Sequence, residues 1–533
     1  MHFLRQASFV FSVSSICPTF LFLKLFLSFY SASTPYFLLV LFKNKLSLYY
    51  NRSPHSHLSD FFDASLGKPF KQYRPKMKLI LAFLISLSIL TSGYSQSLPL
   101  LKVGKDQHYI VTENDHPFFW LGDTAWELIH RSSREEVDLY LSDRANKGFT
   151  VIQTVILAEF NGLKTPNAYG DTPLLNNDPS KLNEAYFTHV DYVIEKAHEL
   201  GLYIALLPTW GDKFNKKWGT GPEIFSPENA HTYGQLLAQR YLKHPNLVWV
   251  LGGDRPLENE THLAIVRAMA QGIGEVDRQH LMTFHPVGEK KATDYVDDPW
   301  LDIDMFQSGH SSMAQEYRYV WESRKSSKPR PIINGEARYE NIPDRFWLHK
   351  DYGWLDDADV RVSAYWSMLA GSAGYTYGCN DIWQMYDGVR EPVIQARTGW
   401  QTALQLPGAL QMSYMKRIFE RLPWQKMIPA QEMLLNKGVE DASYTLCSMG
   451  SDRRFVLAYT PLGLPIDVDL TKMDSKRFNA YWFNPRNGQT SRIGQFDSSS
   501  SHAFKPWASG RGSDFLLILT AENHPFDPSN ERN

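Results

Sequence analysis

The chain has 533 residues, of which 43% are hydrophobic and 21% are charged, and its formal net charge is −2. That length accommodates one large domain and a smaller one. The near-neutral charge, without any dense run of Lys or Arg, excludes a phosphate-coating surface, so nucleic acid is not an expected partner.

The first element that the sequence predicts is an export signal at 77–95. Met77 opens the run "MKLILAFLISLSILTSGYSQ", which has one Lys, an apolar stretch over 79–90 and small residues around Ser95. This is the layout of a secretory signal peptide. We therefore expect an exported protein, periplasmic, extracellular or on the cell surface, whose mature form begins near Gln96.

Residues 1–76 precede that methionine. They hold apolar runs interrupted by Lys24, Lys43 and Lys45, without the periodicity of a packed domain. We expect them to be translated upstream sequence or a disordered leader. A membrane-anchored leader is the alternative, although each apolar run is too short to span a bilayer alone.

Eight strand-like apolar runs follow, alternating with segments of helical period. Helix signals lie between them: Ser133 as an N-cap, Gly201 as a terminator and the pair Ser226-Pro227 as a start. The runs cover 118–126, 150–158, 203–210, 247–254, 281–286, 302–310, 331–336 and 374–380. This alternation predicts an α/β fold, a (β/α)8 barrel over 98–422.

A doubly wound sheet is the alternative fold. It would carry a glycine-rich phosphate loop after an early strand, and no GxGxxG or GxxxxGK[ST] motif stands in that position.

After about Pro423 the pattern changes to short alternating strands. "YTLCSM", "RFVLAYT", "FNAYWFNPRNG" and "DFLLILT" are separated by turn residues, which predicts a small β-sandwich over 423–522 and a tail over 523–533. The pair Asn487-Gly488 is typical of a hairpin turn. We expect this domain to act as a structural cap.

Catalytic groups of a barrel gather at the C-terminal ends of its strands. Two carboxylates stand there directly after glycine: Asp254 in "LVWVLGGDRP" and Glu336 in "PIINGE". Strands four and seven lie across a barrel from each other, so both acids can face one ligand. Such a pair favours glycosidic bond cleavage, in which one acid protonates the leaving oxygen and the other attacks the anomeric carbon or activates water. For either acid alone a salt bridge is the competing interpretation, because Arg255 and Arg338 lie within two residues.

Other side chains at strand ends are expected to bind sugar hydroxyls or to stack on sugar rings, a use for part of the 15 Trp and 27 Tyr. These candidates are Asp123, Trp126, Gln153, Trp210, Asp212, His285, Gln307, His310, Tyr377 and Asn380. Burial among tryptophans should raise the pKa of the acid. Trp249 is out of phase with Asp254 and should point elsewhere, and Trp366 should pack in the core.

No metal and no cofactor are predicted. His285 and His310 are residue types that ligate metals, but they stand on separate strands without the spacing of a metal motif. Cys17, Cys379 and Cys447 form no CxxC or Cys/His cluster. We expect Cys379 and Cys447 to be separate thiols.

Several motifs together resemble the apiosidase-like glycoside hydrolases, over nearly all of 98–522. They are "FFWLGDTAWEL" (118–128), "GFTVIQ" (148–153), "LPTWGDK" (207–213), "LVWVLGGDR" (247–255), "PIINGEARYE" (331–340) and "RVSAYWSMLAGSAGYTYG" (361–378). The resemblance implies a (β/α)8 barrel followed by a β-sandwich of the type named as a collagen-binding domain.

The same resemblance implies Asp254 as acid/base, Glu336 as nucleophile, and exo-acting release of apiose from side chains of the pectic polysaccharide rhamnogalacturonan II. Related barrel glycosidases mostly have Asn-Glu where this chain has Gly-Asp. Asp is one methylene shorter, which affects the carboxyl separation, about 5–5.5 Å for retention and about 6.5–9.5 Å for inversion. Alternatives are another β-glycosidase or endo-glycanase acting on plant cell-wall oligosaccharide or polysaccharide, or a non-catalytic carbohydrate-binding protein.

Overall fold

The computed structural model describes residues 98–436 and 438–526. The expected leader (1–76), the expected signal peptide (77–95) and residues 527–533 of the expected tail lie outside the described residues. The described part begins with a hairpin of β1 (Leu101–Val103) and β2 (Ile110–Thr112).

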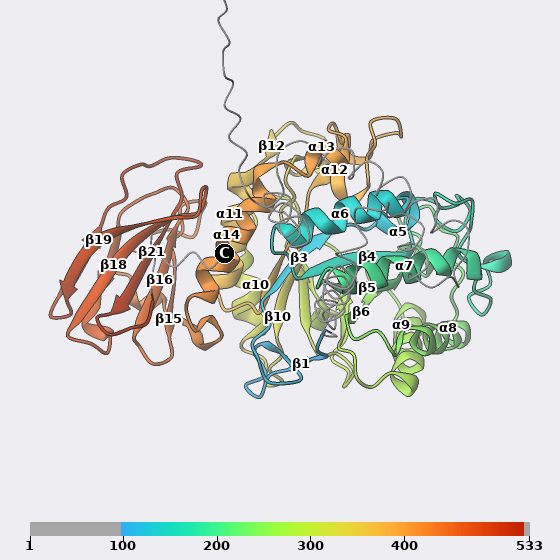
Figure 1. Ribbon diagram of the computed structural model, residues 1–533, viewed down its shortest axis with the longest axis horizontal. Helices are drawn as coiled ribbons and strands as arrows, with labels where there is room; N and C mark the ends of the chain where they lie inside the picture. Colours follow the sequence, from blue (N-terminus) through green and yellow to red (C-terminus); the bar gives the residue numbers. More distant parts are fainter. Residues whose placement is uncertain (1–97, 437, 527–533) are drawn as a thin grey trace, which may run out of the picture. The chain divides into compact units, whose positions relative to one another are not determined.

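Eight parallel strands then form the ring of a barrel (Figure 1). They are β3 (Trp120–Thr124), β4 (Val151–Leu157), β5 (Tyr203–Thr209), β6 (Leu247–Gly252), β7 (Met282–His285), β9 (Asp304–Gln307), β10 (Ile332–Glu336) and β13 (Gly374–Tyr377). The order across the sheet is β7-β6-β5-β4-β3-β13-β10-β9, with the short β8 (Lys290–Lys291) antiparallel to β9. Its two outer parallel strands, β7 and β9, approach at a single parallel bridge between Thr283 and Ile303, which nearly closes the ring. The predicted barrel is confirmed.

The strands form where they do because both of their faces are buried. Every residue of β4 and β5 is buried, with one face inside the ring and the other under the helices. Parallel strands in that position are recognisable as uninterrupted apolar runs.

Helices follow the strands on the outside of the ring (Figure 1). Ser133 and Ser226 form capping boxes at the starts of their helices, and Asn183 caps a third, so the predicted helix starts are confirmed. The helices are α5 (Leu128–Arg131), α6 (Arg134–Asn146), α7 (Glu184–Glu199), α8 (Pro227–Tyr241), α9 (Glu260–Val276), α10 (Glu316–Ser323), α11 (Asp357–Leu369), α12 (Asn380–Trp383), α13 (Trp400–Ala403) and α14 (Pro407–Glu420).

Short elements complete the loops of the barrel. A two-stranded sheet pairs β11 (Ile342–Pro343) with β12 (Trp354–Leu355). Single 3₁₀ turns are η2 (Leu175–Asn177), η3 (Gly211–Lys213), η4 (Ala292–Asp294), η5 (Phe346–Leu348), η6 (Val393–Gln395), η7 (Trp424–Lys426), η8 (Gln431–Met433) and η9 (Leu470–Lys472).

The C-terminal domain is antiparallel. Its six-stranded sheet has the order β14-β15-β16-β21-β18-β19, and β17 pairs with β20 in a second, two-stranded sheet. The strands are β14 (Met427–Pro429), β15 (Leu446–Gly450), β16 (Phe455–Thr460), β17 (Ile466–Asp469), β18 (Arg477–Asn484), β19 (Gln489–Asp497), β20 (Ser501–Phe504) and β21 (Phe515–Ala521). The β18–β19 hairpin closes through four residues, 485–488, rather than through the pair Asn487-Gly488 alone.

Strands β15, β16 and β21 of the six-stranded sheet are buried on both faces. Residues such as Val456 and Leu517 belong to a core shared with Ile466 and Phe504 of the small sheet. Alternate residues, such as Leu457 and Ile518, join the core of the barrel. This alternation follows from the two-residue period of a strand.

Helix α11 lies between the barrel and the C-terminal sheet. All its residues except Asp357 and Val362 are buried. Trp366 packs in this core as expected, with its indole N–H donating to the carbonyl of Tyr444 at 3.0 Å.

Cys379 and Cys447 are buried free thiols, as predicted. Among the helices of 98–436 and 438–526, none combines the length and apolar character needed to cross a bilayer.

Candidate active site

Strand β6 ends in a backbone turn that carries Asp254. The φ angles of Gly252, Gly253 and Asp254 are +94°, +110° and +53°. A Cβ on Gly252 would lie 2.4 Å from the carbonyl oxygen of His285, and one on Gly253 would lie 2.7 Å from the amide nitrogen of Gly211. Only glycine accommodates both the angle and the close approach. The two glycines therefore let the chain turn sharply beside β7 and present Asp254.

Asp254 lies against a fully buried arginine. The guanidinium of Arg255 donates to the Asp254 carbonyl at 2.8 Å and to Asp254 Oδ2 at 3.3 Å, and its other nitrogen pairs with Glu159 at 2.8 Å. Burial, followed by the charge of Glu336, raises the pKa of Asp254 to about 7, although Arg255 opposes this. A carboxyl group with that pKa can give up a proton at neutral pH.

Glu336 ends β10 in a different environment. Its Oε2 lies 3.0 Å from Nε2 of His285, its Oε1 lies 3.3 Å from Nε2 of His310, and its side chain is 8% exposed. Burial alone would raise the pKa of Glu336, but the two imidazole contacts outweigh it and lower the pKa to about 2. Glu336 is therefore ionised at neutral pH and available as a nucleophile.

Aromatic rings surround the two acids. Trp126 packs against Trp210 with ring centroids 5.1 Å apart and meets the edge of His285 at 5.2 Å. The rings of Tyr339 and His310 have centroids 4.3 Å apart, and burial, followed by the charge of Glu336, raises the pKa of Tyr339. These rings pack around the two histidines that contact Glu336 and offer flat apolar surfaces to a sugar.

Several buried polar atoms at this mouth have no protein partner. Among the described residues, Trp210 Nε1, Gln307 Oε1 and Gln153 Oε1 form no hydrogen bond. Buried polar groups are normally satisfied, so these atoms are candidates for binding substrate hydroxyls. The amide nitrogen of Gln153 donates to the carbonyl of Gly335 at 2.7 Å, next to Glu336.

A family model described as "Apiosidase-like, catalytic domain" matches residues 104–426. The chain belongs to the apiosidase-like family. A second model, described as "Putative collagen-binding domain of a collagenase", matches residues 428–520. The resemblance noted from the motifs is confirmed.

Solved structures agree with this assignment. One named "Glycoside hydrolase" is 30% identical with a TM-score of 0.74, covering 80% of this chain and 98% of its own. A glycoside hydrolase family 5 structure from Bacteroides vulgatus ATCC 8482 is also 30% identical with a TM-score of 0.74, covering 81% and 95%. A structure from that organism described as "a putative glycoside hydrolase", 15% identical with a TM-score of 0.61 and covering 80% and 83%, shares the fold. No curated protein matched the chain. This apiosidase-like protein is therefore a glycoside hydrolase.

Two of the expected sugar ligands in this apiosidase-like barrel point away from its mouth. Asp123 accepts hydrogen bonds from Tyr140 at 2.6 Å and from Arg144 at 2.5 Å, under helix α6. Its neighbour across the ladder, Tyr377, donates to Glu340 at 2.6 Å. Successive strand residues face opposite sides, and both residues stand on the outward side. Their contacts therefore lie in the wall of the barrel, and a role in binding sugar stays a prediction for both residues.

Two further candidates hold loops together. Asn380 donates to the carbonyl of Ile394 at 2.8 Å and accepts from the indole of Trp383 at 3.1 Å. Asp212 is fully buried and accepts from Lys213 at 2.5 Å and from the amide of Gly221 at 2.8 Å. The polar groups of both side chains already have protein partners, and direct sugar binding by these two residues stays a prediction.

Contacts and strand pairing bring the other expected residues together, namely Asp254, Glu336, Trp126, Gln153, Trp210, His285, Gln307 and His310. Glu159 and Tyr339, which are not among the predicted catalytic or sugar-binding residues, join the site through Arg255 and Glu336. The competing salt bridge is present for Asp254 but not for Glu336, because Arg338 pairs with Glu316 at 2.9 Å. Trp249 points away as expected and donates to Asp277 at 2.8 Å.

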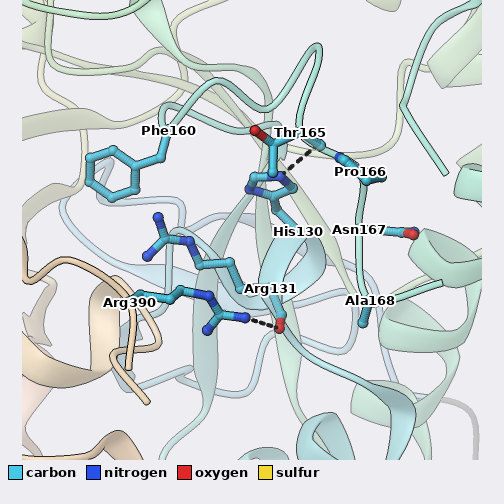
Figure 2. A pocket seen from close by; sticks show the side chains of 8 residues that line it. All are labelled: His130, Arg131, Phe160, Thr165, Pro166, Asn167, Ala168 and Arg390. Atoms are coloured by element: carbon cyan, nitrogen blue, oxygen red, sulfur yellow. Dashed lines mark hydrogen bonds between the residues drawn. The ribbon is translucent and has the colours of Figure 1, made fainter. Parts of the chain in front are cut away.

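A separate pocket of about 380 Å³, whose lining includes neither acid, opens over the loops after β3, β4 and β13 (Figure 2). His130 contacts the carbonyl of Thr165 at 3.0 Å, and Arg390 contacts that of Arg131 at 3.5 Å. His130 lies 2.7 Å from Glu127 and Arg390 lies 3.0 Å from Asp387, so both basic side chains of the pocket already have acidic partners. We assign this pocket no ligand. Within the described ranges, no cluster of His, Cys, Asp or Glu suited to a metal ion occurs.

Proposed function

We propose that this glycoside hydrolase is an exported, exo-acting enzyme that releases apiose from rhamnogalacturonan II side chains, with Asp254 as acid/base and Glu336 as nucleophile. The opposite pKa shifts of the two acids carry the proposal: about 7 for Asp254 and about 2 for Glu336. Environments that push two carboxyl pKa values apart are typical of an acid and a nucleophile working together. The apiosidase-like family model supports the choice of sugar.

In the first step the Glu336 carboxylate attacks the anomeric carbon while Asp254 gives its proton to the oxygen of the departing sugar. The glycosidic bond breaks, the leaving group departs as an alcohol, and the glycosyl unit becomes covalently bonded to Glu336. In the second step Asp254, now a carboxylate, takes a proton from water, and the water oxygen displaces Glu336. The products are free sugar and the original enzyme.

The environments of the two acids suit these steps. His285 and His310 hold Glu336 in its ionised form. Arg255 fixes the Asp254 side chain, and the pKa near 7 lets Asp254 alternate between donor and acceptor. Trp126 and Trp210 would contact the apolar face of the sugar, while Gln307 and Gln153 would pair with its hydroxyls.

The test is a digest of a panel of plant polysaccharides that includes rhamnogalacturonan II, followed by identification of the released sugars. Free apiose should accumulate while the polymer backbone keeps its length. The matched control is Glu336→Gln, which keeps side-chain size and removes the nucleophile. Release of another sugar, or shortening of the backbone, would replace this proposal with another glycosidase or an endo-glycanase. Binding without hydrolysis by the natural chain would favour a carbohydrate-binding protein.

The stereochemical course is a separate test of the two roles. Proton NMR of the first product should show the anomer of the substrate, because two displacements at the anomeric carbon restore its configuration. Appearance of the opposite anomer would make Glu336 a base that activates water.

Export is tested in the native organism. Mass spectrometry of the secreted or periplasmic fraction should give an N-terminal peptide that starts near Gln96. A mature peptide from residues 1–76 would contradict it.

A further inference from the structure

Trp218 differs from the other tryptophans near the two acids. Trp126 and Trp210 are each 3% exposed, whereas Trp218 is 59% exposed. Single exposed apolar residues are common and need no function. Trp218 is distinguished by its position beside Arg255 and by the contacts that fix the loop carrying it.

The indole of Trp218 lies over the guanidinium of Arg255, which is 4.6 Å from the ring centroid. Arg255 is fully buried, and its guanidinium nitrogens lie 3.3 Å from a carboxylate oxygen of Asp254 and 2.8 Å from one of Glu159. One side chain therefore separates Trp218 from the acid/base. The cation fixes the orientation of the ring.

The loop that carries Trp218 is tied down on both sides. The Asp212 carboxylate accepts from the amide of Gly221, and a Cβ on Gly219 would lie 2.4 Å from Cβ of Asp212 and 2.7 Å from Nη2 of Arg255. Lys217 forms an ion pair with Glu258.

Asn215 adds a further tie, donating to the carbonyl of Pro256 at 2.8 Å, in the segment that follows Asp254. Asp212, expected to bind sugar, thus builds the support for an aromatic ring instead. A fixed ring loses little conformational entropy when a ligand covers it.

We propose that Trp218 is the stacking platform for the sugar ring on the leaving-group side of the scissile bond. This rests on the proposed function, because the acid/base of a glycosidase stands beside the leaving oxygen. A ring held next to Asp254 therefore meets the sugar that departs, and its indole can cover the apolar C–H face of that sugar. The site recognises the remainder of the polysaccharide, not the sugar that becomes bonded to Glu336.

The experiment compares Trp218→Ala and Trp218→Phe with the natural enzyme on two substrates. One is the polysaccharide that the panel identifies, and the other is the glycosyl fluoride of the released sugar, whose leaving group has no ring. Trp218→Ala should lose about tenfold in kcat/KM on the polysaccharide and change little on the fluoride. Trp218→Phe should recover most of the loss.

Trp507→Ala is the matched control. Trp507 is 60% exposed and packs its ring edge on Phe515 in the C-terminal domain, 4.5 Å between centroids. It should leave both substrates unchanged. Thermal melting should show that each variant is folded.

Equal losses on both substrates, or no loss on either, would overturn the role of Trp218 and leave the proposed function standing. A loss of the same size in Trp507→Ala would also overturn it. A natural enzyme that hydrolyses no glycoside in the panel would overturn both proposals. Titration of the Glu336→Gln variant with an oligosaccharide gives a second readout, because quenching of indole fluorescence should fall when Trp218 is replaced.

Discussion

The ends of β6 and β10 place the same chemical group in two different ways. At β6 three successive positive φ angles turn the chain, and the Asp254 side chain is left 24% exposed beside a cation. At β10 the strand runs on to Glu336, which is 8% exposed and lies between two imidazoles. The pKa of the first is raised to about 7 and that of the second is lowered to about 2.

This difference shows that residue type does not determine the role of a carboxyl group. Each acid is partly desolvated, and desolvation raises the pKa of both. The charge of Glu336 adds to that effect on Asp254, whereas His285 and His310 reverse it on Glu336. The placement of the two histidines thus decides which acid keeps its proton.

The largest expected loss of activity follows removal of the Glu336 carboxylate. Glu336→Ala should reduce turnover by several orders of magnitude on every substrate, because no leaving group, however good, replaces the missing nucleophile. Steady-state rates on the polysaccharide and on the glycosyl fluoride check this. Added azide should restore cleavage of the substrate by attacking the anomeric carbon in place of Glu336, and the product should be a glycosyl azide of inverted configuration. Residual activity above about 1% would contradict the assigned role.

Loss of Asp254 should be smaller and should depend on the leaving group. Asp254→Asn should reduce kcat on the polysaccharide by about 10²–10⁴-fold, the usual contribution of general acid–base catalysis. The formation of the glycosyl intermediate from the fluoride should be nearly unaffected, because fluoride leaves without a proton. A burst of fluoride in stopped-flow measurements shows this. Loss of the fluoride burst, to the same extent as the loss of kcat on the polysaccharide, would mean that Asp254 is not the proton donor.

The two glycines that precede the acids sharpen the comparison at the level of stability. Gly253→Ala should destabilise the fold by about 1–3 kcal/mol, because a Cβ would be strained at that φ and would meet the backbone of Gly211. Gly335→Ala should cost less, since its Cβ would meet the side chain of Met305, which can move. Urea unfolding of both variants tests the order, and an equal cost would contradict the difference in backbone geometry.

The smallest expected effect is a gain in thermal stability of Asp254→Asn at high pH. The folded pKa of Asp254, about 7, exceeds the ordinary value of 3.8, so its protonated form stabilises the fold at low pH and this contribution is lost as pH rises through 7. Asp254→Asn should therefore melt a few degrees higher than the natural chain at pH 8 and at nearly the same temperature at pH 4. Calorimetry at the two pH values checks the sign, and a higher melting temperature only at pH 4 would contradict it.

Most of the barrel was predictable because its strands are buried on both faces. Runs such as 203–210 are uninterrupted and apolar, and the glycine at 201 marks the end of the preceding helix. Strand β19 ("QTSRIGQFD") was indicated only as the partner strand of the predicted hairpin, because it lies at the edge of its sheet with exposed or half-buried residues. Such a strand lacks the apolar alternation that the prediction needs.

The site was predictable only in part. The acids follow glycine at the ends of apolar runs, which the sequence displays. The side chains of Asp123 and Tyr377 stand on the face of the sheet that points away from the mouth. The two-residue period of a strand could have placed them on that face from the sequence. The pairing of Arg255 with Glu159 joins loops 96 positions apart, and no local pattern records such a contact.

Helix α11 has a consequence for how the molecule unfolds. Arg361 on this helix pairs with Asp514 at 2.8 Å, Ser448 donates to the carbonyl of Leu369, and Tyr365 stacks on Tyr459 at 4.6 Å. Because one helix supplies core to both the barrel and the sheet, neither can melt without exposing the surface that the other covers. The two family models meet near residue 427, but the shared helix couples the two domains across that boundary. Heat should therefore unfold both domains in one cooperative transition.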